Sequence, residues 1–449
     1  VLCSSQHPSE IQHKCAAVLG VPYHAVTVEV RRMGGAFGGK ESQGNLPACA
    51  AALVAAKTGR PAKVVYDRDD DMMLTGKRHD FRIDYRAGVD TDGRILGLVV
   101  EHALRCGMSW DLSEPIGDRA MFHADNCYFL PNAQITSYRC KTHTQSNTAF
   151  RGFGGPQGML GMERIVDHIA AQLGRDALAL RRANFYDRRD AVDGGRNRTH
   201  YGMTVADCVI QDIVDDLAAD ADYTGRRAAI DAWNAENRYI KRGLALTPVK
   251  FGISFTKTFL NQAGALVLVY SDGSIGLNHG GTEMGQGLFV KVAQVVAEVF
   301  QVDLDRVKIT ATNTGKVPNT SATAASSGAD LNGMAAKIAA EEIKQRLVTF
   351  LADRSSVAQT DIRFAGGRVW IGAGESLSFG EAVNAAYMAR VPLSATGFYA
   401  TPKITWDRAA GTGRPFFYFA YGAALTEAAV DVMTGESRLL RADLLHDVG

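Results

Sequence analysis

Three glycine-rich segments hold most of the residues whose types and spacing could do chemistry. They read RMGGAFGGKES at 32–42, NTAFRGFGGPQG at 147–158 and HGGTEMGQGL at 279–288. Glycines among polar neighbours let several backbone N–H groups converge without interference from a Cβ, which suits an anionic ligand or a bulky cofactor. The alternative for any one segment is a plain tight turn, because glycine often only marks a change of chain direction.

The first segment nearly matches a phosphate-binding loop, since Gly34, Gly39 and Lys40 have the GxxxxGK spacing. Glu41 follows where a Ser or Thr hydroxyl should hold magnesium, and a carboxylate there would repel a triphosphate. We therefore reject a nucleotide triphosphatase. Taken alone, Glu41 would be interpreted as a carboxylate in the first turn of a helix, where the helix dipole favours negative charge.

The second segment places Arg151 between Phe150 and Phe153, among glycines that would let a planar ligand approach. A plain surface arginine is the alternative interpretation of Arg151. None of the three segments contains GxGxxG, so the fingerprint of a dinucleotide site is absent from them.

Hydrophobic patterns predict the elements that must position these segments. A β-branched, alternating run at 25–32 predicts a strand before the first segment, and small apolar residues at 46–56 predict a helix after it. Alternating runs within 81–105 and 266–279 surround Asp-Gly turns and predict two hairpins. Further helices are expected at 157–173, 204–218, 287–301 and 334–351. Strands and helices mix without regular βαβ alternation, so the fold class is α+β.

Composition limits the possible partners. The chain has 449 residues, with 49 Lys and Arg against 48 Asp and Glu. This length predicts two or more domains, and the balanced charge gives no long-range field for nucleic acid or an acidic membrane. No apolar run reaches the ~18 residues of a membrane helix, and no export signal opens the chain. We expect a cytoplasmic protein that binds a small molecule or another protein.

Seven cysteines are scattered along the chain, an odd number that argues against a disulfide framework. They are Cys3, Cys15, Cys49, Cys106, Cys127, Cys140 and Cys208. None is paired at the spacing that iron–sulfur or structural zinc sites use, so any such cluster is expected on a partner.

Six segments in order resemble the molybdenum hydroxylase family, and within it the molybdopterin-binding subunit of the bacterial xanthine dehydrogenases. They are RMGGAFGGKE, NTAFRGFGGPQGM, KFGISFTKTFLNQAGALV, GGTEMGQGL, VPNTSATAASSGADLNG and LSATGFYATP. The resemblance covers essentially the whole chain. It implies two elongated mixed domains, with a molybdenum cofactor in the cleft between them. We place parts of these domains at 1–240 and 241–449, because the charged, helix-prone stretch 220–242 could connect them.

The resemblance also implies which residues surround the cofactor. In the family, molybdenum carries oxo, sulfido and hydroxyl ligands and a pterin dithiolene, and no protein side chain coordinates it. The positions that match the metal's surroundings are Gln6, Phe37, Arg151 and Ala325. The other matching cofactor positions are Gly38, Gln286, Ala324 and Ser326.

Substrate positions follow from the same resemblance. Glu41 and Arg119 match the catalytic pair that hydrogen-bonds a purine at opposite ends. A guanidinium such as Arg119 can stabilise negative charge as it develops, and a carboxylate such as Glu41 can exchange protons with ring nitrogens. Phe153 and Phe255 match the aromatic residues that sandwich the purine, and Thr256 matches a hydrogen-bonding position beside them. Without the resemblance, Arg119 would be interpreted as a helix surface charge and Phe255 as a core residue.

The implied reaction converts hypoxanthine to xanthine and xanthine to urate. Electrons would pass to [2Fe–2S] clusters and FAD on a partner chain and then to NAD, in a heterotetramer of two subunit pairs. Oxygen is the alternative acceptor, because that choice is made around the flavin, for which this sequence has no site. The family's general-base glutamate lies in a GEPP motif, and no GEPP occurs here. Both ends look unfinished, since the chain starts at Val1 and stops on the strand-like run RLLRADLLHDVG at 438–449. We therefore expect the base in a continuation of the sequence.

Three alternatives remain at this point. An aldehyde oxidase-type hydroxylase would share the fold, but a generalist pocket has little use for the charged pair Glu41 and Arg119. A carbon monoxide dehydrogenase would carry a cysteine where this chain reads Phe150, Arg151 and Gly152. An inactive pterin-binding module is the third, and it rests on the absent base.

Overall fold

The computed structural model describes residues 1–31, 33–188 and 195–448. Arg32, which opens the first glycine-rich segment, and Gly449, which closes the second expected domain, lie outside the described residues. The chain divides into two compact units, each assembled from three separate segments. Unit 1 consists of Val1–Arg78, Thr148–Arg151 and Lys257–Pro402, and unit 2 of His79–Asn147, Gly152–Thr256 and Lys403–Gly449.

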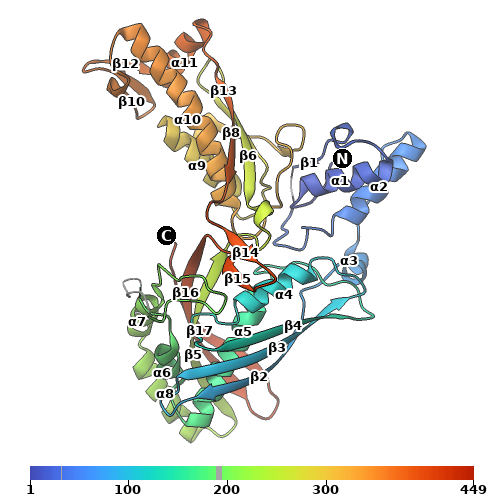
Figure 1. Ribbon diagram of the computed structural model, residues 1–449, viewed down its shortest axis with the longest axis vertical. Helices are drawn as coiled ribbons and strands as arrows, with labels where there is room; N and C mark the ends of the chain where they lie inside the picture. The colour runs from blue at the N-terminus through green and yellow to red at the C-terminus, as the bar shows by residue number, and fades with distance from the viewer. Residues whose placement is uncertain (32, 189–194, 449) are drawn as a thin grey trace. The chain divides into compact units, whose positions relative to one another are not determined.

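Unit 1 combines small helices from its first segment with a helix-backed sheet from its last (Figure 1). The first segment forms α1 (Pro8–Leu19), η1 (Tyr23–Ala25), β1 (Glu29–Val30), α2 (Asn45–Thr58) and α3 (Arg68–Leu74). The last segment forms η2 (Thr258–Leu260), β6 (Gln262–Val269), β7 (Ile275–His279), α9 (Leu288–Phe300), η3 (Leu304–Arg306), β8 (Val307–Ile309), β9 (Thr312–Asn313), α10 (Gly328–Ser355), η4 (Gln359–Asp361), β10 (Ile362–Ala365), β11 (Arg368–Ile371), β12 (Glu375–Ser378), α11 (Phe379–Met388) and β13 (Ser394–Ala400).

A four-stranded sheet in the order β13-β6-β7-β8 is the centre of this last segment. Helix α10 lies along β13 and β6 (Figure 1). The helix can approach the sheet closely because Ala335, Ala336, Ala339 and Ala340 on its buried face are all 0% exposed. Gly397 on β13 completes this contact, since a Cβ there would lie 2.0 Å from the Ala335 carbonyl oxygen.

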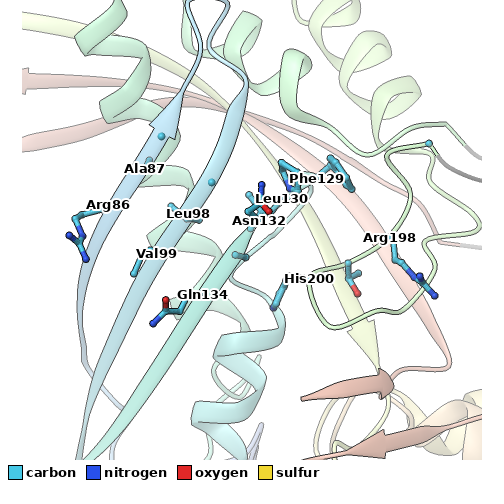
Figure 2. A pocket seen from close by; sticks show the side chains of 16 residues that line it. Arg86, Ala87, Leu98, Val99, Phe129, Leu130, Asn132, Gln134, Arg198 and His200 are labelled. Atoms are coloured by element: carbon cyan, nitrogen blue, oxygen red, sulfur yellow. The ribbon is translucent and has the colours of Figure 1, made fainter. Parts of the chain in front are cut away.

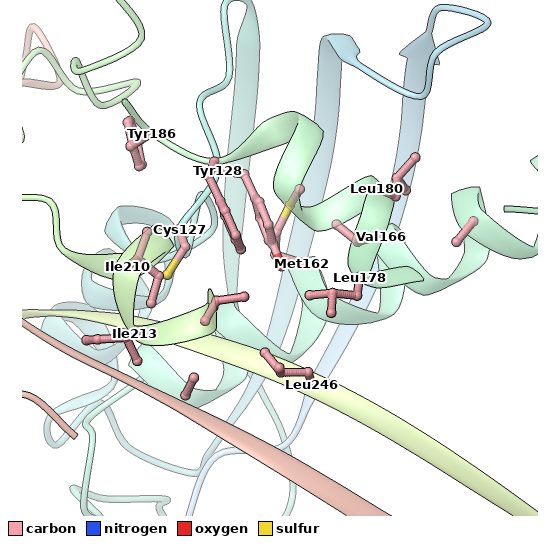
Figure 3. Close-up of a cluster of buried hydrophobic side chains, with 14 of the residues drawn as sticks. Cys127, Tyr128, Met162, Val166, Leu178, Leu180, Tyr186, Ile210, Ile213 and Leu246 are labelled. Carbon is pink, nitrogen blue, oxygen red and sulfur yellow. The ribbon is translucent and has the colours of Figure 1, made fainter. Parts of the chain in front are cut away.

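Unit 2 contains two three-stranded sheets, β2-β3-β4 and β17-β16-β5. Its elements are β2 (Phe81–Val89), β3 (Ile95–Gly107), α4 (Ser113–Phe122), β4 (Ala133–Lys141), α5 (Gly155–Leu173), α6 (Ala177–Asn184), α7 (Ile210–Asp220), α8 (Tyr223–Glu236), β5 (Ile240–Ile253), β14 (Thr405–Asp407), β15 (Thr412–Arg414), β16 (Tyr418–Asp431) and β17 (Ser437–His446). Side chains from both sheets and from α5, α6 and α7 share one apolar core, part of which Figure 3 shows.

Most predicted elements are present, with one clear difference. The predicted hairpins are β2–β3 and β6–β7, both antiparallel, and every predicted helix overlaps an observed one. The strand expected at 25–32 was wrong in length, because only Glu29 and Val30 pair with β9. The valines of this run are buried in small apolar clusters beside α1 and the first glycine-rich segment, so burial rather than sheet pairing explains their alternation.

Candidate functional site

Gln6 connects the first glycine-rich segment, at Gly38, to the distant residue Thr323 of unit 1. The Gln6 side chain, 1% exposed, accepts a hydrogen bond from the Gly38 N–H at 2.7 Å and donates to the Thr323 carbonyl at 2.9 Å. The Thr323 hydroxyl in turn accepts from the Thr282 N–H at 2.8 Å, at the start of the third segment. One buried amide therefore joins residues that lie more than 300 positions apart in the chain.

The second segment reaches the same place with its first half. A Cβ on Gly38 would lie 2.9 Å from the Ala149 and Phe150 backbone, so only glycine lets the two segments touch. Arg151 is exposed, and its guanidinium lies 5.5 Å from the centre of the Phe37 ring. Arg151 is thus a surface arginine, as the alternative interpretation expected. It also makes a cation–π contact with Phe37, another predicted site residue.

Three amides at the third segment are already occupied, because the segment's own carboxylate accepts from them. Glu283 accepts from the N–H groups of Gly285, Gly287 and Phe289 at 2.9, 3.0 and 3.0 Å. Burial raises the pKa of Glu283, but these backbone donors outweigh it and hold the pKa below its ordinary value. The interpretation of this segment as an anion-binding loop is therefore wrong for these amides.

Gln286 is held within the same loop. Its side-chain oxygen accepts from the Met284 N–H at 2.7 Å, and its amide donates to the Thr282 carbonyl at 3.0 Å. The loop also contacts the first segment, since the Phe37 N–H points at the Met284 sulfur at 3.4 Å.

Strained backbone marks several of the predicted positions. Among non-glycine residues, Phe37, Ala325, Ser326 and Phe153 have φ of 49°, 56°, 58° and 52°. Side chains rarely adopt this left-handed region, and such strain persists where the surroundings enforce it, often at functional sites. Ala324 lies directly before Ala325, in the segment that Thr323 ties to Gln6.

Two buried polar atoms of the third segment lack a partner among the described residues. The Thr282 hydroxyl is one, in a residue that is 0% exposed, and the His279 Nε2 is the other, in a residue that is 3% exposed. The His279 Nδ1 accepts from the Gly281 N–H at 3.1 Å, so the proton belongs on Nε2. Burial lowers the pKa of His279 to about 4 and keeps the ring neutral. Orphaned polar groups beside Gly285 and Gly287, whose Cβ positions face open space, fit a site that accepts a bulky polar cofactor.

The phosphate-loop interpretation fails in the structure as well. Lys40, which should reach a phosphate, donates instead to the Ser4 hydroxyl at 3.0 Å and to the Met33 carbonyl. Glu41 does not lie in the first turn of α2, which begins at Asn45 and has no acidic residue there. Glu41 is 9% exposed, with its N–H bonded to the Gly38 carbonyl, so this residue is buried within the first segment.

Arg119 is the central predicted residue of unit 2, and it is not a surface charge. It lies near the end of α4 and is 2% exposed. Its guanidinium donates to the carbonyls of Gly252, at 3.0 Å, and Ser254. It also lies 5.2 Å from the centres of both the Phe251 and Phe416 rings. Two carbonyls and two ring faces therefore fix its direction.

The second half of the second glycine-rich segment serves packing. A Cβ on Gly154 would lie 2.0 Å from the Ile116 carbonyl oxygen, and one on Gly158 would lie 2.3 Å from the Ala120 carbonyl oxygen. These glycines let α5 lie against α4, the helix that carries Arg119. The expectation that the glycines here admit a planar ligand is thus replaced, for Gly154 and Gly158, by contact between helices.

The structure divides the predicted residues between the units. All the predicted cofactor positions belong to unit 1, namely Gln6, Phe37, Gly38, Arg151, Gln286, Ala324, Ala325 and Ser326. The substrate positions Arg119, Phe153, Phe255 and Thr256 belong to unit 2, and Glu41 belongs to unit 1. Phe255, 8% exposed, and Thr256 follow the end of β5, directly after the Ser254 carbonyl that holds Arg119.

Sequence reasoning missed Glu283, Thr323, His123 and Phe416, each of which orders a predicted site residue. Glu283 and Thr323 both lie in segments that carry the family resemblance. For Glu283, a carboxylate within a glycine loop was a usable signal. No signal in the sequence identified His123 or Phe416, because their roles depend on contacts between α4, β5 and the region after β15.

A separate pocket of about 1060 Å³ lies in unit 2 (Figure 2). Residues of β2, β3 and the segments 129–134 and 195–200 line it, with Arg86, Arg198 and His200 among them. None of the predicted site residues lines this pocket. Its size alone does not assign it a chemistry.

Other features of the described residues bear on the class of protein. Within residues 1–31, 33–188 and 195–448, no three metal-ligating side chains gather as they would around an ion. All seven cysteines are free thiols. In the same part of the chain, no helix has the length and apolar character to cross a membrane.

Comparison with known proteins gives a consistent result. Two models described as Molybdopterin cofactor-binding domain match residues 1–185 and 216–449. The "Xanthine dehydrogenase/oxidase" of Felis catus is 44% identical over 99% of this chain and 32% of that protein. The "Xanthine dehydrogenase" of Oryza sativa subsp. japonica is 42% identical over 100% of this chain and 31% of that protein. The chain therefore spans less than a third of the length of these curated relatives.

Solved structures of lower identity share the fold. Quinoline 2-oxidoreductase from Pseudomonas putida 86 has a TM-score of 0.86 at 22% identity and covers 100% of this chain and 57% of that one. Aldehyde oxidoreductase from Desulfovibrio gigas has a TM-score of 0.83 at 22% identity, with 100% and 45% covered. These matches confirm the mixed α+β class. The predicted division at 240/241, and a cofactor cleft between two domains, stay predictions.

Proposed function

Because the chain belongs to the molybdopterin cofactor-binding domain family, we propose that it forms the cofactor-binding and purine-binding part of a xanthine dehydrogenase. The observation that carries this proposal is the convergence in unit 1 of segments around Gln6, Phe37, Gln286 and Thr323. The identity of 44% and 42% to proteins named for xanthine supports the choice of substrate.

The eight cofactor positions of unit 1 would hold a molybdenum–molybdopterin group, which supplies two-electron oxidation when bound. Gln6 already has its side-chain oxygen and nitrogen bonded to Gly38 and Thr323, so its amide is oriented before any ligand arrives. The group would be enclosed by the exposed side chains of Arg151 and Phe37 and by the loop that contains Gln286. The orphaned Thr282 hydroxyl and His279 Nε2 offer further donors nearby.

Arg119 and Glu41 would bind the purine at opposite ends. A guanidinium held by two carbonyls cannot turn away from a substrate oxygen, so it can stabilise negative charge there without reorganising. Glu41 would accept or share a proton with a ring nitrogen. Phe153 and Phe255 would pack on the flat ring, with Thr256 donating a hydrogen bond beside them.

The electron carriers of the proposed enzyme would be bound outside this chain. Electrons would leave for [2Fe–2S] clusters and FAD on a partner chain or domain, and then for NAD, in an assembly of two subunit pairs. No GEPP motif occurs in this sequence, so none of its glutamates is assigned the general-base role. The free thiols support a reducing compartment, and we therefore place the protein in the cytoplasm.

The test is Arg119→Ala in the complete, cofactor-loaded enzyme. We expect xanthine turnover to fall about 10³-fold or more, because a preorganised charge partner is lost, while molybdenum content per polypeptide stays unchanged. Arg86→Ala, at an exposed arginine on β2, is the matched control and should change neither quantity. Loss of bound molybdenum in proportion to activity would contradict the substrate role of Arg119.

A further inference from the structure

His123 links the helix that carries Arg119 to the strand that holds its guanidinium. His123 is the C-cap residue directly after α4, and it is 1% exposed. Its Nε2 lies 3.0 Å from the Gly252 backbone nitrogen, and its Nδ1 lies 2.8 Å from the Arg119 carbonyl oxygen. An amide N–H can only donate, so Nε2 accepts, and the ring proton lies on Nδ1 and is donated to Arg119.

The same two residues are joined a second time by the Arg119 side chain. Its Nη1 donates to the Gly252 carbonyl at 3.0 Å, and its Nη2 donates to the Ser254 carbonyl. The peptide units on both sides of Gly252 are therefore bonded, one to the His123 ring and the other to the guanidinium. A shift of β5 at Gly252 would move both contacts together.

His123 and Arg119 also share their aromatic neighbours. The His123 ring centre lies 4.9 Å from that of Phe251 and 5.3 Å from that of Phe416. The guanidinium carbon lies 5.2 Å from the centre of each of these rings. A Cβ on Gly252 would lie 2.3 Å from Phe416, so the ring is pressed directly against the strand that holds Arg119.

The imidazole suits this place only in its neutral form. A protonated ring would lose its acceptor for the Gly252 N–H and would add a positive charge beside Arg119. Burial, and next the charge of Arg119, hold the pKa of His123 well below its ordinary value. The two hydrogen bonds and the shared rings thus connect the neutral His123 ring to the Arg119 backbone and to the strand that holds the Arg119 guanidinium.

We propose that His123 is the positioning residue that fixes the direction of the Arg119 guanidinium, with Phe416 as its aromatic support, and that it thereby sets the preference for a purine over a simple aldehyde. The inference rests on the purine-binding role proposed for Arg119. An aldehyde has no oxygen at the far end of a ring system for Arg119 to bind, so its turnover depends less on where the guanidinium points. Small displacements of a positioned group cost about 10²-fold in rate.

The experiment compares His123 variants in the complete, cofactor-loaded enzyme. His123→Phe keeps a ring without hydrogen bonds, His123→Asn keeps a donor near Nδ1, and His123→Gln keeps an acceptor near Nε2. We expect kcat/KM for xanthine to fall about 10- to 100-fold in the Phe and Asn variants. The Gln variant should recover part of the loss. Turnover of a small aromatic aldehyde and molybdenum content should stay within about 3-fold, because the cofactor site of unit 1 is untouched.

Two further variants keep the proposal falsifiable where a His123 variant fails to fold. Phe416→Leu retains apolar volume but removes a ring face, and it should show the same selective loss for xanthine. His102→Phe, at a 1%-exposed imidazole on β3, is the matched control for burying a phenyl ring, and it should not discriminate between the substrates. Equal losses for xanthine and aldehyde, or unchanged xanthine turnover in His123→Phe and Phe416→Leu, would overturn the inference.

A double variant separates this inference from the proposed function. If His123 acts through Arg119, His123→Phe should cause no further loss of xanthine turnover once Arg119→Ala is present. An additive loss would assign His123 a role independent of Arg119 and would overturn the inference alone. Full xanthine turnover in Arg119→Ala would instead refute the proposed role of Arg119.

Discussion

At the scale of single residues, the carboxylate of Glu283 shows how a glycine loop can be ordered by its own chain. Three backbone N–H groups of the loop point at this one side chain. The loop that presents Gln286 is therefore set before a cofactor binds. Neither substrate nor metal is needed to explain the glycines at Gly285 and Gly287, whose φ of 101° and 76° the turn requires.

Replacing Glu283 by Gln should weaken this loop. The amide keeps the size of the side chain but loses the charge that three donors share, which we expect to cost about 1–3 kcal/mol of local stability. Molybdenum retained per polypeptide after gel filtration should fall, while Glu341→Gln on the exposed face of α10 should not change it. Full retention in Glu283→Gln would show that the loop is ordered by other contacts.

The same carboxylate predicts a dependence on pH. Its pKa is lower in the folded chain than in the unfolded one, so the unfolded state takes up its proton first as the pH falls. The stabilisation is fully present above the unfolded pKa of about 4.3 and is lost as the pH falls through the lower folded pKa. The difference in cofactor retention between the wild type and Glu283→Gln, followed by absorbance, should therefore be largest above about pH 4.3 and shrink as the pH falls.

Glu41 should separate purines from aldehydes. A buried carboxylate that binds a ring nitrogen helps xanthine but offers little to a simple aldehyde. Glu41→Ala should therefore lower kcat/KM for xanthine by about 10²-fold or more, and that for an aldehyde by less. The opposite order would favour an aldehyde oxidase-type enzyme over a xanthine dehydrogenase.

At the scale of elements, close backbone approach explains the glycine at position 397. Gly397 lies in the segment LSATGFYATP, yet its neighbours are the Ala335 carbonyl and the Ala339 amide of α10. The alanine face of α10 and this one glycine form a single packing contact. Gly397 therefore serves helix-on-sheet packing in unit 1.

Gly397→Ala should destabilise unit 1 by about 1–3 kcal/mol, because a Cβ would overlap backbone atoms that cannot turn aside. Urea unfolding monitored by circular dichroism would measure the change. Gly243→Ala on β5 is the matched control, since its Cβ would meet nothing within 4 Å. A loss no greater than that of the control would show that α10 can move away from β13 at little cost.

At the scale of the whole chain, the predicted cofactor residues come from five separate stretches of sequence but from one compact unit. A ligand that binds several stretches at once stabilises the folded state by mass action, by about 4 kcal/mol at a thousandfold excess over Kd. Producing the protein without the molybdenum–pterin group should therefore increase amide hydrogen exchange more in unit 1 than in unit 2. Equal protection with and without the group in unit 1 would argue against the proposed binding residues.

Sequence alone determined the elements whose signals are local. The turns at Asp90–Arg94 and Asp272–Gly273 set the hairpins, and the repeating apolar positions set α5, α9 and α10. Local hydrogen bonds and side-chain spacing along one stretch of chain decide such elements. Ordered motifs likewise led to the family before any fold was known.

Only the tertiary structure decided what each motif residue touches. In the folded chain Lys40 donates to Ser4, and Glu283 accepts from the amides of its own loop. Arg119 is buried beside the Phe251 and Phe416 rings. The tertiary structure also joined Gln6 to Thr323 across the length of the chain and gave the second glycine-rich segment to two units. These contacts depend on side chains far apart in sequence, and a linear pattern carries no information about which of them meet in space.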